Sequence, residues 1–184
     1  MIDHKEIIRV NALQLTTDIQ GWHHEEPIFE RLVNALPNPA VYVEVGCYKG
    51  ASLINVAQFA QHRGIPLQCY AVDFWQEPGL YDQFLHNVIA YEFADRVTTI
   101  QDHSQSAAQA LQRRGIKADL IYIDAGHDCV SCYNDMRAYW PLLKTGGVMF
   151  GDDFTEEKGV REAVILFGMP FNNSYYHWWL EPKL

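Results

Sequence analysis

The chain has 184 residues, of which 48% are hydrophobic, so it is long enough to form one domain with a buried core. Its formal net charge is −9, and its Lys and Arg residues are scattered without runs, which argues against a nucleic-acid partner. No stretch has the length and apolar character of a signal peptide or a membrane span. We therefore expect a cytoplasmic protein without a membrane partner, and the composition leaves open whether it forms a homo-oligomer.

Four cysteines are present, two of which form a lone C-x-x-C, Cys129 and Cys132. A structural zinc site needs four ligands, and the chain has no second pair at a suitable spacing. A redox pair is an alternative, but we expect two reduced cysteines near the start of a helix.

The chain divides into an N-terminal part, residues 1–40, and a core, residues 41–184. Apolar residues at helical spacing follow Pro27 and end before Pro37. The residues just before this helix include Trp22, His23 and His24. From composition alone we expect these residues to form a surface loop with one packed aromatic ring.

The stretch Val41–Ser52 reads as a buried strand, a glycine turn and the start of a helix. Its spacing, E-x-G-x-x-x-G, differs from the G-x-G-x-x-G of dinucleotide enzymes and resembles motif I of the class I S-adenosylmethionine (SAM)-dependent methyltransferases. The resemblance implies that the acidic residue of the strand holds the methionine amino end of the cofactor. It assigns these residues to the cofactor site: Glu44, Gly46, Tyr48, Gly50 and Ser52. A glycine turn between any strand and helix looks similar, so the motif alone is not decisive.

Strands and helices alternate through the rest of the chain. We predict further strands at Leu67–Val72, Val97–Ile100, Leu120–Ile123, Val148–Phe150 and Tyr175–Leu180. Helices are predicted up to Gly64, at Tyr81–Phe93, at Gln105–Arg113, from about Cys132 to Trp140, and from a Thr155 cap to about Phe167. This alternation predicts an α/β fold with a Rossmann-like, doubly wound, mostly parallel sheet and helices on both faces, in a single domain.

Five strands each have a glycine or an aspartate within two residues after their end, and parallel strands bring these positions to one rim of the sheet. The five residues are Gly46, Asp73, Asp102, Asp124 and Asp152. Ligands of open α/β sheets bind at this rim, and the Asp73 carboxylate suits the two hydroxyls of a ribose. In the methyltransferase superfamily, the loop after the third strand reaches the adenine, which assigns Asp102, His103 and Ser104 to the cofactor. Capping of the next helix by Ser104 explains these residues nearly as well.

Three carboxylates follow two neighbouring strands, at Asp124, Asp152 and Asp153. They repel one another unless a cation lies between them, and their hard oxygen atoms favour Mg²⁺, or else Mn²⁺ or Ca²⁺. Alternatively, Asp153 caps the following turn and only Asp152 faces the pocket. His127 follows Asp124 in the same loop and is a candidate general base near neutral pH.

A closer resemblance rests on E-x-G-x-x-x-G-x-S at 44–52, V-D at 72–73, I-D-A-G-H-D at 123–128 and L-L-K-T-G-G-V-M-F-G-D-D-F at 142–154. These motifs are similar to those of the macrocin and mycinamicin sugar O-methyltransferases. The resemblance implies Mg²⁺ at Asp124, Asp152 and Asp153, His127 as the base, and an N-terminal lid over the cofactor. It places Asp124 in both the catalytic and the cofactor site, and it predicts SAM-dependent O-methylation of a small hydroxylated molecule such as a sugar.

Two other functional classes stay open at this stage. A non-catalytic SAM- or nucleotide-binding module needs the glycine turn but not the carboxylates. A metal-dependent hydrolase needs the carboxylates but not SAM. A nicotinamide oxidoreductase is disfavoured, because Tyr48 stands where its pyrophosphate loop requires glycine.

Overall fold

The computed structural model describes Ile19 and residues 27–183, and its centre is one seven-stranded sheet in the order β3-β2-β1-β4-β5-β7-β6. The strands are β1 (Ala40–Val45), β2 (Leu67–Asp73), β3 (Val97–Gln101), β4 (Ala118–Ile123), β5 (Leu143–Gly151), β6 (Phe171–Asn173) and β7 (Trp178–Leu180). Strands β1 to β5 pair in parallel, whereas β7 pairs antiparallel with both β5 and β6. The predicted Rossmann-like, mostly parallel sheet is therefore confirmed.

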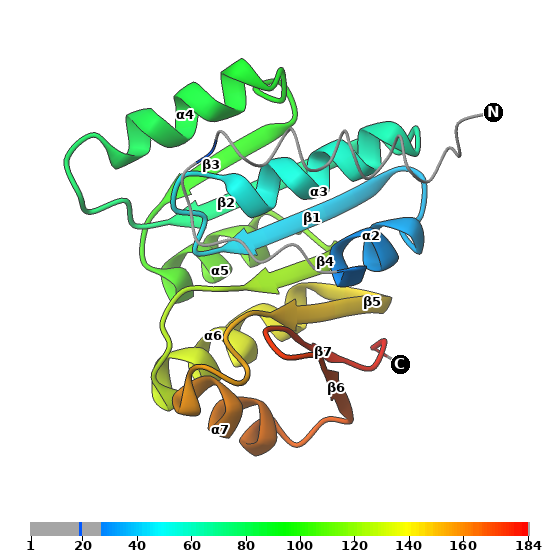
Figure 1. Ribbon diagram of the computed structural model, residues 1–184, viewed down its shortest axis with the longest axis vertical. Coiled ribbons are helices and arrows are strands. Elements are labelled where there is room, and N and C mark those ends of the chain that lie inside the picture. The colour runs from blue at the N-terminus through cyan, green and yellow to red at the C-terminus, as the bar shows by residue number, and fades with distance from the viewer. Residues whose placement is uncertain (1–18, 20–26, 184) are drawn as a thin grey trace.

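Helices cover both faces of the sheet, as Figure 1 shows. They are α2 (Pro27–Asn34), α3 (Ala51–His62), α4 (Leu80–Ala90), α5 (Ser104–Arg113), α6 (Cys129–Tyr139) and α7 (Lys158–Phe167), with a short 3₁₀ helix, η1, at Trp140–Leu142. One face carries α2, α3 and α4, and the other carries α5, α6 and α7. The described part of the chain contains no helix that is long and apolar enough to cross a membrane.

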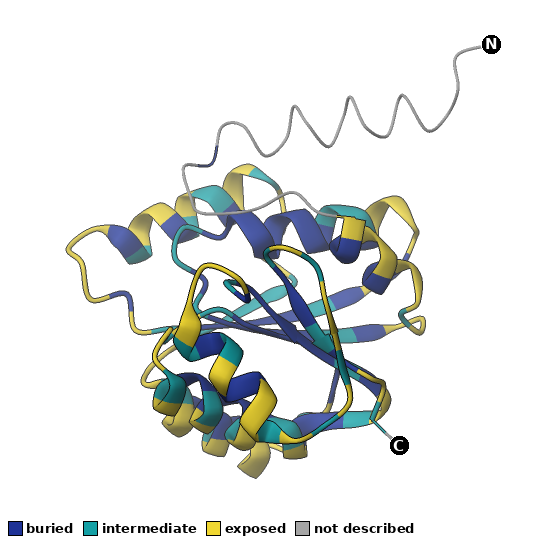
Figure 2. Ribbon diagram, turned by 60° about the horizontal axis from the view of Figure 1, so that its bottom comes forward, coloured by how far each residue is buried: buried dark blue, intermediate teal, exposed yellow. Residues whose placement is uncertain are grey.

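The alternation of side chains along each strand divides the core into two layers. In β1, Tyr42 packs with the α2–α4 layer, while Val43 and Val45 pack with the α5–α7 layer. Because both faces are covered, every residue of β4 is buried, and the central strands are dark throughout in Figure 2.

Backbone hydrogen bonds continue past the ends of the strands and tie the first loop residues together. Gly46 N donates to Val72 O, and Asp124 N donates to Val45 O, each at 2.8 Å. Asp102 N donates to Asp73 O at 3.2 Å. The loops at the carboxyl ends of β1 to β4 therefore begin from fixed positions.

The C-terminal hairpin differs from the prediction. The expected strand Tyr175–Leu180 is shortened to β7, because Ser174 N donates to His177 O and His177 N donates to the Ser174 hydroxyl, which closes a tight turn. The strand β6 before this turn was not predicted. By contrast, β5 is longer than predicted, because it begins at Leu143 rather than at Val148.

Two predicted helix caps are wrong. Ser104 is the first residue of α5 rather than its cap, and α7 begins three residues after Thr155, without a side-chain cap. Helix α6 begins earlier than predicted, because the Asp128 carboxylate accepts hydrogen bonds from Val130 N and Ser131 N. Trp22, His23 and His24 lie outside the described residues, so the proposed lid stays a prediction.

We expect Gly151→Ala to destabilise the fold, because Gly151 is where β5 packs against both β4 and β7. A Cβ atom at this position would lie 2.5 Å from Ile123 O and 2.5 Å from the Trp178 ring. Overpacking of this kind costs about 1–3 kcal/mol or more in free energy of unfolding, measured by urea denaturation. Gly64→Ala is the comparison: it has no neighbour within 4 Å and carries only the backbone strain of its positive φ of 68°. A cost for Gly151→Ala no larger than this backbone strain would contradict the steric argument.

Candidate active site

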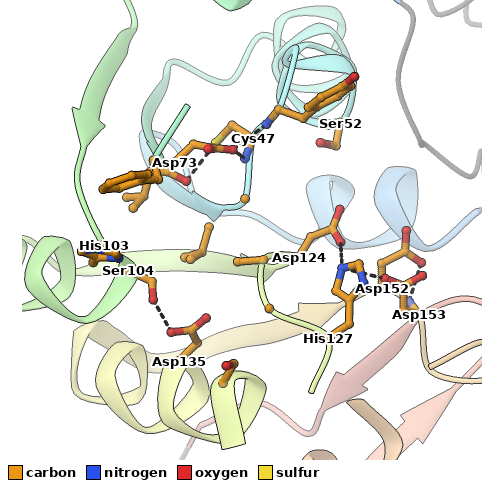
Figure 3. A pocket seen from close by; sticks show the side chains of 18 of the residues that line it. Cys47, Ser52, Asp73, His103, Ser104, Asp124, His127, Asp135, Asp152 and Asp153 are labelled. Carbon is orange, nitrogen blue, oxygen red and sulfur yellow. Dashed lines mark hydrogen bonds and ion pairs between the residues drawn. The ribbon is translucent and has the colours of Figure 1, made fainter. Parts of the chain in front are cut away.

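A cavity of about 820 Å³ lies at the carboxyl ends of the parallel strands. The five glycine and aspartate residues predicted at the ends of the strands all line it: Gly46, Asp73, Asp102, Asp124 and Asp152. Figure 3 shows that its side chains come from both loops and helices, with Asp135 and Ser104 toward one end and Asp124 and His127 toward the other. The single rim predicted from the strand ends therefore exists.

The glycine turn lies directly against the end of β4. Gly46 has a φ of 90°, and a Cβ atom there would be 1.8 Å from Asp124 O, so only glycine fits. Gly50 has a φ of 88° at the N-cap of α3, and Tyr48, which lines the cavity, has a φ of 45°. The turn thus leaves the start of α3 beside the cavity.

The carboxylate of Asp73 holds this turn in place. Its Oδ2 accepts hydrogen bonds from Cys47 N at 2.9 Å and Tyr48 N at 2.8 Å, and its Oδ1 accepts one from Trp75 N at 2.8 Å. A carboxylate has about four acceptor positions, so one is left for a ligand hydroxyl. Asp73 is thus both a structural residue of the loop and a lining residue of the cavity.

Glu44 is fully buried and does not line the cavity. Its two oxygens accept hydrogen bonds from the Tyr42 hydroxyl at 2.5 Å and the Ser52 hydroxyl at 2.6 Å. The direct contact with the cofactor that the resemblance implied is therefore not available to Glu44, whereas Ser52 does reach the cavity. Burial raises the pKa of Glu44 to about 7.

The three residues after β3 lie together at one end of the cavity. The His103 ring stacks on Phe74, with ring centroids 4.5 Å apart and an interplanar angle of 25°. The Ser104 hydroxyl donates to Asp135 Oδ1, and Asp102 Oδ1 accepts a hydrogen bond from His103 N at 2.7 Å. This end of the cavity therefore offers an aromatic surface next to hydrogen-bonding groups.

At the other end, Asp124, His127 and Asp153 place one potential metal-ligand atom each within 4.8 Å of one another. His127 Nε2 lies 3.1 Å from Asp153 Oδ2 and 3.9 Å from Asp124 Oδ1. The structure thus brings together two of the three predicted metal ligands and the predicted base.

Asp152 lines the cavity but is not part of this cluster. Its side chain is 4% exposed, its Oδ1 accepts a hydrogen bond from Asp153 N at 2.9 Å, and the same oxygen lies 3.5 Å from His177 Nε2. Asp153 has a φ of 62°, and its Oδ2 lies near His127, whereas Asp152 Oδ1 lies near His177. The two consecutive carboxylates therefore have different imidazole neighbours.

The carboxylates of the cluster are disfavoured in their charged forms. The pKa of Asp124 is raised well above its ordinary value by burial and then by the charges of Asp152 and Asp153. The pKa of Asp153 is raised mainly by burial, and the neighbouring His127 opposes this shift. A positive ion between these groups would offset both effects.

Phe74 and Asp135 are among the cavity residues that were not predicted from the sequence. Asp135 lies on the buried face of α6 together with Cys132, Met136 and Tyr139. An acidic residue within an apolar helical stripe was the available signal, because such a carboxylate is buried only where it has hydrogen-bond donors.

The cysteines do not form a metal site in the described part of the chain. All four are free thiols, and Cys129 and Cys132 do not line the cavity. Burial raises the pKa of Cys132 to about 12, which disfavours the reactive thiolate.

This strand order, with a glycine turn after the first strand and a ligand cavity at the strand ends, defines a class I methyltransferase fold. Residues 43–154 match a family model described as a methyltransferase domain. The match covers more than half of the 184 residues, and the chain belongs to this family. The predicted resemblance to SAM-dependent methyltransferases is thereby confirmed. Among curated proteins, none matches the chain significantly in sequence.

Solved methyltransferase structures share the fold at low sequence identity. A putative rRNA methylase from Clostridium thermocellum has a TM-score of 0.68 at 12% identity, over 88% of this chain and 100% of that one. A TDP-rhamnose 3'-O-methyltransferase of calicheamicin biosynthesis has a TM-score of 0.66 at 16% identity, over 98% of this chain and 86% of that one. An O-methyltransferase from Bacillus cereus, in complex with S-adenosylhomocysteine (SAH), has a TM-score of 0.66 at 15% identity, over 96% of this chain and 89% of that one.

The raised pKa of Glu44 predicts a pH-dependent stability. The unfolded chain binds this proton less tightly, with a pKa of 4.5, so the stability that Glu44 contributes is complete below pH 4.5 and is lost as pH rises through about 7. Across this window we expect the free energy of unfolding of wild type to fall by roughly 3 kcal/mol relative to Glu44→Gln, which keeps a neutral acceptor for Ser52. Urea denaturation of both proteins from pH 4.5 to 8 measures this difference. A difference that stays constant with pH would contradict it.

Proposed function

We propose that the protein is a SAM-dependent O-methyltransferase that uses a divalent cation, Mg²⁺ or else Mn²⁺ or Ca²⁺, to methylate a small hydroxylated molecule. The observation that carries this proposal is the position of Asp124, His127 and Asp153. They lie in the same cavity as the glycine turn and the stacked aromatic pair, at its other end. One cavity therefore offers a nucleoside site and a charged site for an acceptor hydroxyl.

The lining of the cavity fits SAM. Its volume of about 820 Å³ is within the range of small-molecule sites, which leaves room for a cofactor and a small acceptor. SAM carries positive charge on its sulfonium and amino groups, and the lining is rich in carboxylates. The start of α3 beside the glycine turn exposes N–H groups that suit the cofactor carboxylate. Tyr48 and Ser52 are the cofactor residues that we assign to this part of the cavity, and Asp73 is assigned to the ribose. Gly50 does not line the cavity and acts as the N-cap residue of α3.

The donor set of the cluster fits a divalent cation. Two carboxylates and an imidazole lie within coordinating reach of one ion, and waters or an acceptor oxygen complete the shell. We assign Asp124 and Asp153 as ligands. Asp152, also predicted as a ligand, supports the site through its hydrogen bond from Asp153 N.

When bound, SAM supplies an electrophilic methyl group and the cation supplies positive charge that favours deprotonation of a nearby hydroxyl. Within this site we assign His127 as the base that accepts the hydroxyl proton, since it lines the cavity and its side chain is 44% exposed. Asp153, 3.1 Å away, then stabilises the protonated imidazole and fixes the direction of the ring. Positioning and electrostatics supply most of the rate.

Charge favours a small acceptor over RNA, although two of the structural neighbours are named as rRNA methylases. The net charge is −9, and a surface of that sign repels a phosphate backbone. The sugar O-methyltransferase among the neighbours supports a hydroxylated small molecule as the acceptor class. A panel of free sugars, nucleotide sugars and catechols, tested beside RNA for SAM consumption, separates the two classes.

We expect SAM and SAH to bind with micromolar dissociation constants in calorimetry, and Phe74→Ala to weaken SAH binding. Stacking of a base on an aromatic side chain is worth about 1–3 kcal/mol, or roughly 5- to 150-fold in affinity. Phe74 is 40% exposed, so its loss should hardly change the melting temperature. Ile89→Ala is the matched control, because Ile89 is exposed on α4 and does not line the cavity. If wild type binds neither ligand, the proposal fails, and a hydrolase that uses the carboxylates alone becomes the better reading.

A second experiment separates the metal from the base. Mg²⁺, Mn²⁺ or Ca²⁺ should raise the stability of wild type by about 2.7 kcal/mol at a hundredfold excess over its dissociation constant. Asp153→Asn should lose most of this gain. His127→Ala should keep the gain but lower turnover by roughly 10²–10⁴. Asp128→Asn is the control, because it keeps the cap of α6 and lies outside the cavity.

The outcomes distinguish the assignments. If none of the three cations shifts the melting temperature, with or without SAM, the metal-dependent mechanism is wrong. If His127→Ala loses the metal effect as fully as Asp153→Asn, His127 is a ligand and not the base. SAM binding without turnover on any acceptor in the panel would favour the non-catalytic binding module.

A further inference from the structure

Asp135 is a buried carboxylate that the proposed reaction does not use. It lies on α6, is 2% exposed, and lines the cavity near Ser104, toward the end opposite the metal cluster. Its Oδ1 accepts hydrogen bonds from the Ser104 hydroxyl and from Gln105 Nε2, the latter at 2.7 Å. Two side chains at the start of α5 therefore hold this carboxylate in a fixed orientation.

The second oxygen of Asp135 is available to a ligand. Within residues 27–183, no hydrogen bond or ion pair involves Oδ2. Burial raises the pKa of Asp135 to about 6, which shows that the surroundings do not fully compensate its charge. A buried carboxylate oxygen is stabilised when a donor reaches it, so this position selects a ligand with an N–H or O–H group.

An aromatic pair lies toward the same end of the cavity as Asp135. His103, which stacks on Phe74, directly precedes Ser104, the hydrogen-bond partner of Asp135. A ligand that uses both features is a flat ring with a hydrogen-bond donor on its edge. An aminopurine has this chemistry, whereas a 6-oxopurine has a carbonyl oxygen in place of the amino group, and a carboxylate repels that oxygen.

We propose that Asp135 determines the specificity of the cavity for the base of the cofactor, by accepting a hydrogen bond from the exocyclic amino group of adenine at Oδ2. This inference rests on the proposed function, because it takes SAM and SAH as the ligands. It adds a residue of α6 to the site that we assign to the loops after the strands and to the first residues of α3 and α5. Ser104 and Gln105 act as positioning residues that hold the carboxylate.

Asp135→Asn is the informative substitution. The amide oxygen can keep the two hydrogen bonds from Ser104 and Gln105, and the amide nitrogen then replaces Oδ2. The side chain keeps its shape while the group that faces the ligand changes from acceptor to donor. Asp119→Asn is the matched control, because Asp119 is a buried carboxylate at the far end of β4 that does not line the cavity.

The experiment compares two ligands, SAH and its 6-oxo analogue S-inosylhomocysteine, by calorimetry on the full-length protein. Wild type should bind SAH at least tenfold more tightly than the analogue. Asp135→Asn should weaken the binding of SAH by about ten- to hundredfold, the range for a hydrogen bond to a charged group. It should also remove or reverse the preference for SAH over S-inosylhomocysteine. A purely structural role would weaken both ligands by the same factor.

The results separate this inference from the function on which it rests. If wild type binds neither ligand, the proposed function fails. If wild type binds SAH but Asp135→Asn leaves the ratio of the two affinities unchanged, while Asp119→Asn behaves as wild type, the role of Asp135 is overturned. If Asp135→Asn does not fold, the test is the ratio of the wild-type affinities for SAH and S-inosylhomocysteine, and a ratio near one overturns the inference.

Discussion

The shape of the site depends on the Asp73 carboxylate, which accepts hydrogen bonds from three backbone N–H groups. Two of these groups belong to the glycine turn after β1, and the third belongs to the loop after β2. The turn places Tyr48 at a positive φ and presses Gly46 against β4, an arrangement that needs such an external restraint. Hydrogen bonds to a charged acceptor are among the stronger ones, so Asp73 sets the shape of the cavity before any ligand arrives.

The cavity is built from acidic groups with few cations beside them, and this imbalance organises its chemistry. Behind the cavity wall, Glu44 accepts hydrogen bonds from two hydroxyls, and within the cavity Asp135 accepts them from a hydroxyl and an amide. Among the described residues, His127 is the ion-pairing partner given for both Asp124 and Asp153. Buried carboxylates raise one another's pKa, so each unsatisfied oxygen favours a ligand that carries positive charge or a donor. The proposed cationic cofactor and divalent ion would each compensate this negative charge, at different places.

The sequence predicts the sheet and the rim well, because buried strands followed by glycine or aspartate obey topological rules that hold for all parallel sheets. It does not predict the direction of individual side chains. Asp152 and Asp153 are adjacent, yet only the backbone turn at Asp153 brings that residue to His127. Ser104 fits the pattern of a helix cap but donates to Asp135, a contact between residues 31 positions apart that no local pattern encodes.

The two ends of the cavity are held by different secondary-structure elements. The residues near the base come from α5, α6 and the loops after β2 and β3, whereas Asp124, His127 and Asp153 come from the loops after β4 and β5. Under the proposed function, recognition of the nucleoside and transfer of the methyl group would then depend on separate elements. One end could be redesigned for an unnatural cofactor while the residues at the proposed reacting end keep their positions.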